Sequence, residues 1–215
     1  RARRIPLLAA GGRGPDQPGH PRGVRARGER LIAVDPVVVA AFEEAGAFLR
    51  GHFQLASGRH SDAYLEKFNL LQWPPQTAVV CGRLAEGGRA FAPQLVVGPT
   101  TGGVIIAYEV ARALGLRGVI AERDEGGRSI GRHFHLEPGE RALVVDDVLT
   151  TGGSVRETLD AVRKAGGVPI GVAVMVDRSG GKVDFGVPLF AATEVEMQTW
   201  DASACPLCAQ GVPLE

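Results

Sequence analysis

The chain has 215 residues, of which 45% are hydrophobic and 22% are charged, and its formal net charge is zero. This length is sufficient for one large domain with a substantial core, or for one domain with a small appendage. Aromatic residues make up only 6% of the chain, which argues against a surface that stacks on nucleic-acid bases. No run of about 18 apolar residues occurs, so a membrane-spanning helix is not expected.

The zero net charge conceals an uneven distribution. Residues 1–30 contain eight arginines and two acidic residues, a net charge of +6, so the rest of the chain carries −6. An acidic body argues against nucleic-acid binding by the folded part. Residues 1–34 are rich in glycine and proline and lack helical or strand periodicity, so we interpret them as a disordered extension. A basic anion-binding arm and an arginine-rich transit peptide are the alternatives.

Regular structure is expected to begin at the N-cap and first-turn pair Asp35 and Pro36. Apolar residues then recur at helical spacing as far as residue 49, and Gly51 is expected to end this helix. Two short strands are expected next, at residues 53–55 and 63–65 on either side of a turn. An amphipathic helix is expected after a Pro-Pro pair, at residues 76–90.

From residue 94 onward the pattern alternates between strands and helices. Strands are expected at residues 94–97, 117–122, 142–145 and 168–176, with one helix that ends near residue 114 and another over residues 152–165. A hairpin tip at residues 124–127 and a strand returning over residues 130–136 would place His133 and His135 on one face. This alternation of Val-rich strands with helices predicts an α/β fold with a doubly wound parallel sheet.

One segment, LVVDDVLTTGGS at residues 143–154, combines a strand, a glycine-rich turn and the start of a helix. Ligands bind at the carboxyl ends of strands in open parallel sheets, and a helix N-terminus at that edge favours phosphate. The turn offers hydroxyl donors and glycines that let the backbone wrap closely around a phosphate. The residues concerned are Thr150, Thr151, Gly152, Gly153 and Ser154.

Two acids precede this turn, and they would repel a bare phosphate. Asp146 and Asp147 are explained if the ligand also brings hydrogen-bond donors, such as the hydroxyls of a ribose. The alternative is an ordinary turn with two acids at a strand end. The segment is neither the Walker phosphate loop nor the dinucleotide fingerprint. Four apolar residues, two acids and Thr-Thr-Gly-Gly-Ser resemble instead the donor-binding signature of the type I phosphoribosyltransferases.

A second pattern, Phe-x-Leu-x-Ser-Gly-x-x-Ser-x-x-Tyr at residues 53–64, resembles the orotate phosphoribosyltransferases. The resemblance implies one catalytic domain over residues 35–200, with a hood at about 50–72 that covers the base and includes Ser57 and Tyr64. A structural hairpin is the alternative. The resemblance also implies that Arg178, just beyond a strand, binds the planar carboxylate of orotate, which neutral purines lack. A surface salt bridge is the alternative for Arg178.

The resemblance further identifies the turn GPTTGG at residues 98–103, with Thr100, Thr101 and Gly102, as the pyrophosphate-binding loop; a packing turn is the alternative. Two departures stand out. The lid at residues 122–129 is short and lacks the family's lysines and histidine, and the pyrophosphate turn and the hood lack lysines that the family tends to have. Only Arg123 transfers to the lid. Three residues are candidates to supply the missing positive charge: Arg128, Arg132 and His133. The alternative is that they are exposed charges of the hairpin.

The implied reaction transfers ribose 5-phosphate from phosphoribosyl pyrophosphate to orotate, in the pathway to UMP. Asp146, Asp147 and Arg123 are the implied catalytic residues, with Mg²⁺ held mainly by the ligand and water rather than by protein. The family also implies a homodimer, with no nucleic-acid or membrane partner. A purine or uracil phosphoribosyltransferase and a donor-sensing regulatory protein are the alternatives.

Three cysteines, Cys81, Cys205 and Cys208, are too few for a disulfide framework and favour a reducing, cytoplasmic setting. Cys205 and Cys208 form a single CxxC pair in a tail at residues 201–215. Zinc normally takes four ligands, and the chain has no second cysteine pair. We therefore favour a buried structural role, with a site pooled between two subunits or a redox-active pair as the alternatives. Cys81 is expected in the core.

Overall fold

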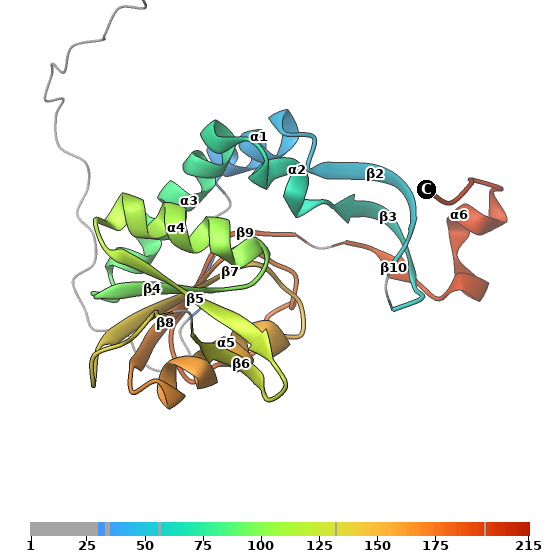
Figure 1. Ribbon diagram of the computed structural model, residues 1–215. Coiled ribbons are helices and arrows are strands. Elements are labelled where there is room, and N and C mark those ends of the chain that lie inside the picture. Colours follow the sequence, from blue (N-terminus) through green and yellow to red (C-terminus); the bar gives the residue numbers. More distant parts are fainter. Residues whose placement is uncertain (1–29, 33–34, 56, 132, 196) are drawn as a thin grey trace, which may run out of the picture.

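The computed structural model describes residues 30–32, 35–55, 57–131, 133–195 and 197–215 (Figure 1). The predicted disordered extension therefore lies almost wholly outside the described residues. Its last part is an exception, because residues 30–32 form strand β1, so regular structure is found before Asp35.

A seven-stranded sheet forms the centre of the domain, with strand order β1-β9-β8-β7-β4-β5-β6. All neighbouring strands are parallel except β5 and β6, which form an antiparallel hairpin. The α/β fold with a parallel sheet is thus confirmed. The strands are β1 (Arg30–Ile32), β4 (Leu95–Pro99), β5 (Arg117–Asp124), β6 (Gly127–Ile130), β7 (Arg141–Leu149), β8 (Val168–Asp177) and β9 (Leu189–Glu194).

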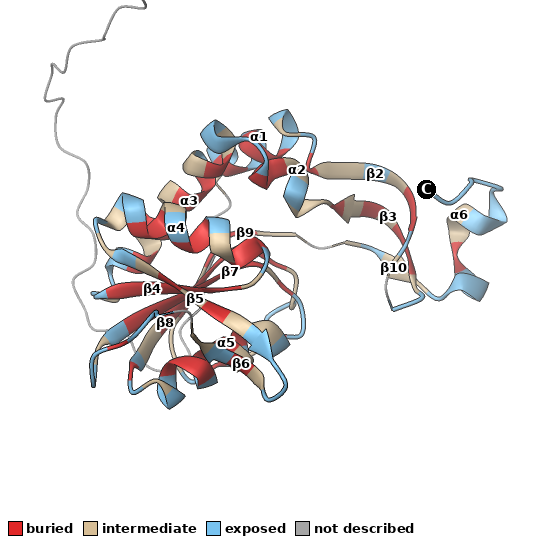
Figure 2. Ribbon diagram, in the orientation of Figure 1, coloured by how far each residue is buried: buried red, intermediate tan, exposed pale blue. Residues whose placement is uncertain are grey.

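Helices cover both faces of this sheet (Figure 1). One face is covered by α1 (Pro36–Glu44), α2 (Lys67–Leu71), α3 (Pro74–Arg89) and α4 (Gly102–Leu114), and the other by α5 (Gly153–Lys164). Successive residues of β7 alternate between the two cores: Leu143 and Val145 face the first, Ala142 and Val144 the second. Burial on both faces explains why the central strands β4 and β7 are largely apolar, and both are drawn mostly red in Figure 2.

A smaller antiparallel sheet projects from the domain and corresponds to the predicted hood (Figure 1). It contains β2 (Phe48–Gln54), β3 (His60–Leu65) and β10 (Thr199–Trp200), in the order β10-β3-β2. The chain leaves the carboxyl end of β9 to reach β10, so the hood lies at the edge where the parallel strands end. The tail then forms the 3-10 helix η1 (Ala202–Ala204) and α6 (Pro206–Ala209).

The first predicted helix is too long. It ends at Glu44, and residues 48–50 begin β2 instead. Gly46 adopts a left-handed φ of 60°, the Gly46 amide donates to the Glu43 carbonyl (2.9 Å) and the Ala47 amide donates to the Phe42 carbonyl (2.9 Å). This pair of hydrogen bonds is the Schellman motif, which ends helices at a left-handed glycine. The helical spacing of the following apolar residues was therefore coincidental.

The strand predicted at residues 130–136 is also wrong. β6 occupies Gly127–Ile130, and His133 has a φ of 66°, which breaks the alternation that would have placed His133 and His135 on one face. The predictions also missed β1, β9 and β10, and they ended β7 too early, since this strand continues through Asp146 and Asp147 to Leu149. Among the described residues, no helix is long and apolar enough to cross a membrane.

Two glycine-to-alanine substitutions should change stability in opposite directions. A Cβ at Gly46 would meet nothing within 4 Å, so Gly46→Ala is penalised only by the left-handed backbone and should lose about 1 kcal/mol of unfolding free energy. Gly82 lies inside α3 with equally open space, so Gly82→Ala should gain roughly 0.5–1 kcal/mol. Urea denaturation of both variants is the measurement; a loss at both positions would contradict this interpretation.

Candidate active site

Two loops meet at the carboxyl edge of the sheet, where β4 and β7 are neighbours. The loop after β4 leads into α4 on one face, while the loop after β7 leads into α5 on the other face. β4 connects onward to β5, whereas β7 connects to β8 on its opposite side, so the strand order reverses between them. Such a switch point opens a crevice between the two loops, and ligands of open α/β sheets bind there.

The loop after β7 presents the start of α5 to this crevice. Its N-cap, Gly152, has a left-handed φ of 80°, and no side chain among the described residues caps the helix. A Cβ at Gly152 would lie 2.9 Å from Val183 and 3.0 Å from Phe185, so the position requires glycine on both counts. Thr150, Thr151 and Gly153 around it are exposed. Free N–H groups at an accessible helix N-terminus suit a phosphate.

The loop after β4 is tight, and it approaches the acids of β7. A Cβ at Gly98 would lie 2.2 Å from the carbonyl oxygen of Gly103. A Cβ at Gly102 would lie 2.2 Å from Oδ2 of Asp147, so any side chain at Gly102 would displace that carboxylate. This closeness gives a physical reason why the chain has no lysine at Gly102. Thr100 and Thr101 precede Gly102 in the loop; Thr100 is partly exposed and Thr101 is exposed.

A lysine that the sequence analysis missed occupies the same place in space. Nζ of Lys67, the first residue of α2, lies 2.6 Å from Oδ2 of Asp147. The Asp147 side chain is only 9% exposed, so solvent screens this ion pair weakly. Lys67 follows the hood pattern by three residues, but nothing in the sequence separates it from a surface lysine. Only the packing of α2 against α4 and the sheet brings its ammonium to the site.

Asp146, beside this pair, is a weaker acid than usual. Its carboxylate accepts a hydrogen bond from the Asp147 amide (2.9 Å), and it is nearly buried at the end of β7. Burial and the neighbouring Asp147 charge raise the pKa of Asp146 to about 6, against the opposing effects of the Asp147 amide, Ser154 and Lys67. A carboxyl group with a raised pKa beside a loop that suits phosphate is typical of a functional site.

Arg128, on the lid strand β6, links the two loops. Its side chain is 5% exposed, and its guanidinium donates to Oγ1 of Thr100 (3.2 Å) and to Oγ of Ser154 (3.2 Å). Its Nε lies 3.4 Å from Glu157 on α5, and burial lowers the pKa of Arg128. Of the three candidates for additional positive charge, Arg128 is thus the one that the structure brings between the predicted phosphate loops.

The other lid residues lie further out. Arg123 forms an ion pair with Glu157 at 3.3 Å, and its side chain is 65% exposed. His133 is exposed in a turn, and Arg132 lies outside the described residues. The hairpin tip at residues 124–127 is exposed or partly exposed, as the lid interpretation requires. In this structure Arg128, rather than Arg123, contacts the loop residues.

The predicted acceptor residues lie between the sheet edge and the hood. Arg178 follows β8 and lines a cavity of about 410 Å³ together with Gln198 and Thr199 of the segment that leads into the hood. Burial lowers the pKa of Arg178, and the nearby Tyr64 opposes this shift. The Tyr64 ring packs on Phe53, with 5.6 Å between centroids. The structure thus places Arg178 near Tyr64, whereas Ser57 is exposed in the turn between β2 and β3 and does not line this cavity.

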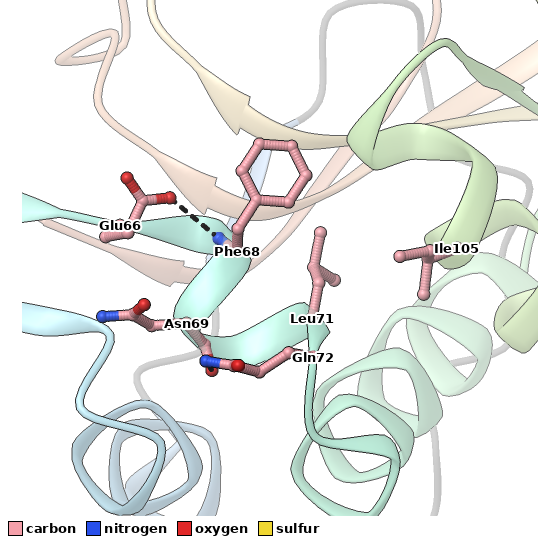
Figure 3. Close-up of a pocket in the computed structure, with 6 residues that line it drawn as sticks. All are labelled: Glu66, Phe68, Asn69, Leu71, Gln72 and Ile105. Carbon is pink, nitrogen blue, oxygen red and sulfur yellow. Dashed lines mark hydrogen bonds between the residues drawn. The ribbon is translucent and has the colours of Figure 1, made fainter.

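A second depression, of about 570 Å³, lies between α2 and α4 (Figure 3). Phe68, Leu71 and Ile105 line it with three polar residues of α2 and its flanks, and the Ile105 side chain points toward Leu71. Phe68 and Ile105 are 46% and 40% exposed. None of the described residues that line this depression is cationic, so it does not resemble a phosphate site.

Comparisons with known proteins agree with this geometry. The family model of the phosphoribosyl transferase domain matches residues 70–201. An orotate phosphoribosyltransferase of Pelotomaculum thermopropionicum is 49% identical over 176 residues, covering 82% of this chain and 93% of that protein. The chain belongs to the orotate phosphoribosyltransferase family. A family member from Caldanaerobacter subterraneus is 45% identical, again over 82% of this chain and 93% of its own length.

A solved structure shows the same fold. The orotate phosphoribosyltransferase from Aeropyrum pernix superposes with a TM-score of 0.60 at 29% identity, covering 73% of this chain and 93% of that one. The type I phosphoribosyltransferase fold with an added hood, predicted from two sequence patterns, is therefore confirmed for this family member.

The two carboxylates at the sheet edge fit Mg²⁺ only as an ion that arrives bound to a phosphate ligand. Asp147 is already paired with Lys67, and Asp146 is partly protonated near neutral pH, so the two carboxylates do not form a cage for a divalent cation. Mg²⁺ commonly keeps several waters and binds through one or two carboxylates and substrate phosphates.

The pKa of Asp146 predicts how its replacement depends on pH. The folded pKa of about 6 exceeds the ordinary value of 3.8 for an aspartic acid, so between these pH values the folded state binds the proton more tightly. The contribution of Asp146 to stability is therefore greatest below about pH 4 and is lost as pH rises through 6. Asp146→Asn removes the buried charge, and it should raise the unfolding free energy at pH 7.5 by about 1–3 kcal/mol but have little effect at pH 4.

Asp147→Asn is the matched control, since it breaks the ion pair with Lys67 and should lower stability at pH 7.5. Denaturant unfolding of the three proteins at both pH values tests this contrast. A stability gain for Asp146→Asn that is equal at pH 4 and pH 7.5 would show that folding does not raise the pKa of Asp146.

Proposed function

We propose that the enzyme transfers ribose 5-phosphate from phosphoribosyl pyrophosphate to a ring nitrogen of orotate, forming orotidine 5′-phosphate and pyrophosphate in pyrimidine biosynthesis. The observation that carries the proposal is the meeting of two phosphate-suited loops around a pair of acids, with Arg178 and Tyr64 close by at the hood. Three cysteines that form no disulfide in the described residues agree with a reducing, cytoplasmic location, which is part of the proposal.

In this proposal the donor spans both loops. Its 5-phosphate binds the N-terminus of α5 and the hydroxyls of Thr150, Thr151 and Ser154. Asp146 and Asp147 accept hydrogen bonds from the ribose hydroxyls, which requires that Asp146 be ionised in the complex. The pyrophosphate lies on the loop of Thr100, Thr101 and Gly102, where the start of α4 also has no side-chain cap among the described residues.

The chemistry then depends on stabilising charge rather than on a protein nucleophile. As the bond at the anomeric carbon breaks, the ribose acquires oxocarbenium character, as in glycoside hydrolysis. The carboxylates of Asp146 and Asp147 stabilise the positive charge that develops on the ribose. Arg128 lies between the loops, and Arg123 on the lid adds positive charge toward the leaving pyrophosphate. Closure of the β5–β6 hairpin would exclude water from the reacting atoms.

Mg²⁺, when bound with the donor, supplies further neutralisation of the pyrophosphate charge. The chain's own residues would hold it through Asp146 or Asp147 and otherwise through the ligand and water. Lys67 prevents two full negative charges from facing the pyrophosphate, because its ammonium neutralises Asp147. Lys67 therefore acts in place of the lysine that relatives tend to have in the pyrophosphate turn.

For the acceptor, the proposal relies on Arg178. Orotate is planar and carries a carboxylate, and a guanidinium binds such a group through two parallel hydrogen bonds. The partial burial of Arg178 strengthens this interaction and makes an unpaired guanidinium unfavourable. A neutral purine or uracil offers no anion to this position, and a donor-sensing protein without turnover would need no acceptor cavity.

Turnover measured with orotate, guanine, adenine and uracil separates these possibilities. We expect product only with orotate, because only orotate supplies an anion for Arg178. Equal or greater turnover with another base would contradict the assignment of orotate as the acceptor. Donor binding without turnover of any base would favour the sensing role.

Arg178→Ala should raise the KM for orotate by about 30-fold or more, in line with about 2–5 kcal/mol for one partner of a buried charge pair, while the KM for the donor changes little. Arg83→Ala is the matched control, since Arg83 is a surface arginine of α3 paired with Glu86. Steady-state kinetics with each substrate varied in turn provide the measurement. Equal losses for orotate and donor would remove the carboxylate assignment.

We also propose a homodimer, as the family implies, through the apolar depression between α2 and α4. Phe68 and Ile105 are exposed there, and Tyr108, which is 70% exposed, shares a face of α4 with Ile105. Tyr108→Glu, facing a second copy of itself, should convert dimers to monomers in light scattering after gel filtration. Val168→Glu, at a 47% exposed apolar residue of β8, is the control and should leave the mass unchanged.

A further inference from the structure

Four metal-binding side chains converge at the outer end of the hood, away from the two phosphate loops. His52 comes from β2, His60 from β3, and Cys205 and Cys208 from the tail, more than 140 residues later in the chain. One nitrogen or sulfur atom of each lies within 4.8 Å of all the others. The CxxC pair therefore does have two further ligands, which are histidines of the same chain rather than cysteines.

The spacing of these atoms suits a tetrahedral ion. With Zn–N of about 2.0 Å and Zn–S of about 2.3 Å, ligand atoms at tetrahedral corners are separated by about 3.3–3.8 Å. Sγ of Cys205 lies 3.4 Å from Nε2 of His52, and Sγ of Cys208 lies 3.7 Å from the same nitrogen and 3.3 Å from Nδ1 of His60. The two nitrogens are 2.9 Å apart and would separate slightly around an ion.

The surroundings orient one of the ligands. Nδ1 of His52 donates a hydrogen bond to the carbonyl oxygen of Val212 (2.7 Å), which leaves the lone pair of Nε2 directed at the two sulfurs and at His60. A metal-ligating histidine commonly donates its second ring N–H to a carbonyl in this way. His52, His60 and Cys205 are 1%, 4% and 3% exposed, so the cluster is enclosed on all sides except at Cys208.

The tail has little else to hold it. In residues 201–215 only Cys205 is buried, so this segment contributes almost nothing to an apolar core. Its remaining contacts include an ion pair between Arg59 and Asp201 and a hydrogen bond from the Glu215 amide to the His52 carbonyl. Small segments without a core commonly depend on a disulfide or a metal.

We propose that His52, His60, Cys205 and Cys208 bind one Zn²⁺ as a structural Cys₂His₂ site that fastens the tail to the hood. The ligand set is the soft sulfur and imidazole combination that selects zinc over Mg²⁺, and all four positions of the tetrahedron are filled by protein. With no open position the ion has no catalytic role. Binding deprotonates both thiols and releases their protons to solvent.

Metal analysis of the full chain tests this proposal. Protein expressed with added zinc and dialysed against metal-free buffer should retain about one zinc per chain by inductively coupled plasma mass spectrometry. Cys205→Ser and Cys208→Ser should each retain well under half of that amount. Cys81→Ala removes a buried thiol of α3 far from the cluster, and it should retain the wild-type amount. Less than a tenth of an equivalent in the wild type would overturn the proposal.

A second measurement covers the case in which the serine variants fold poorly. Cobalt added to metal-free wild-type protein should give the intense visible absorption of a tetrahedral site and the near-ultraviolet thiolate bands, and zinc should abolish both. Zinc should also protect Cys205 and Cys208 from a thiol reagent. Absent cobalt bands, or a Cys205–Cys208 disulfide in the intact mass, would contradict the proposal. Neither measurement uses substrate, so their outcome is independent of orotate turnover.

Discussion

The position of Asp147 is the constraint on which the rest of the site depends. Its carboxylate is enclosed between the backbone of Gly102 and the ammonium of Lys67, at the end of a strand buried on both faces. Gly102 must lack a side chain for the two loops to approach, and Lys67 must lie on α2 for the carboxylate to be neutralised. Burial beside a second carboxylate raises the pKa of the neighbouring Asp146 to about 6.

Features that depend on adjacent residues could be predicted from the sequence. The strand, acids, glycine turn and helix at residues 143–154 are consecutive, so their order alone placed two carboxylates and a helix N-terminus at one sheet edge. Lys67 and Arg128 could not be found in this way, because each reaches the site through packing between distant elements. Without that packing, both residues are indistinguishable from surface cations.

Two of the errors in secondary structure have a common physical origin. At Gly46 and His133 a single residue in the left-handed region ends one pattern and starts another. Hydrophobic periodicity does not register this change, because Phe48 and Leu49 continue the helical spacing of α1 although they belong to β2. The missed strands β1 and β10 are only three and two residues long, and each is stabilised by a partner from another part of the chain. Such short strands have no period of their own to detect.

The hood illustrates how a site depends on groups that take no part in chemistry. β3 carries His60 at one end and, four residues later, Tyr64 near Arg178, while Lys67 follows as α2 begins. The segment that enters β10 holds the same hairpin, because Arg59 donates to the Thr199 carbonyl and Ser61 donates to the Gln198 carbonyl. Gln198 and Thr199 also line the cavity of Arg178. β10 and the hairpin form one antiparallel sheet, and the tail follows β10 directly. Fixing the tail at the histidines therefore also restrains β10, whose Thr199 lines the cavity of Arg178.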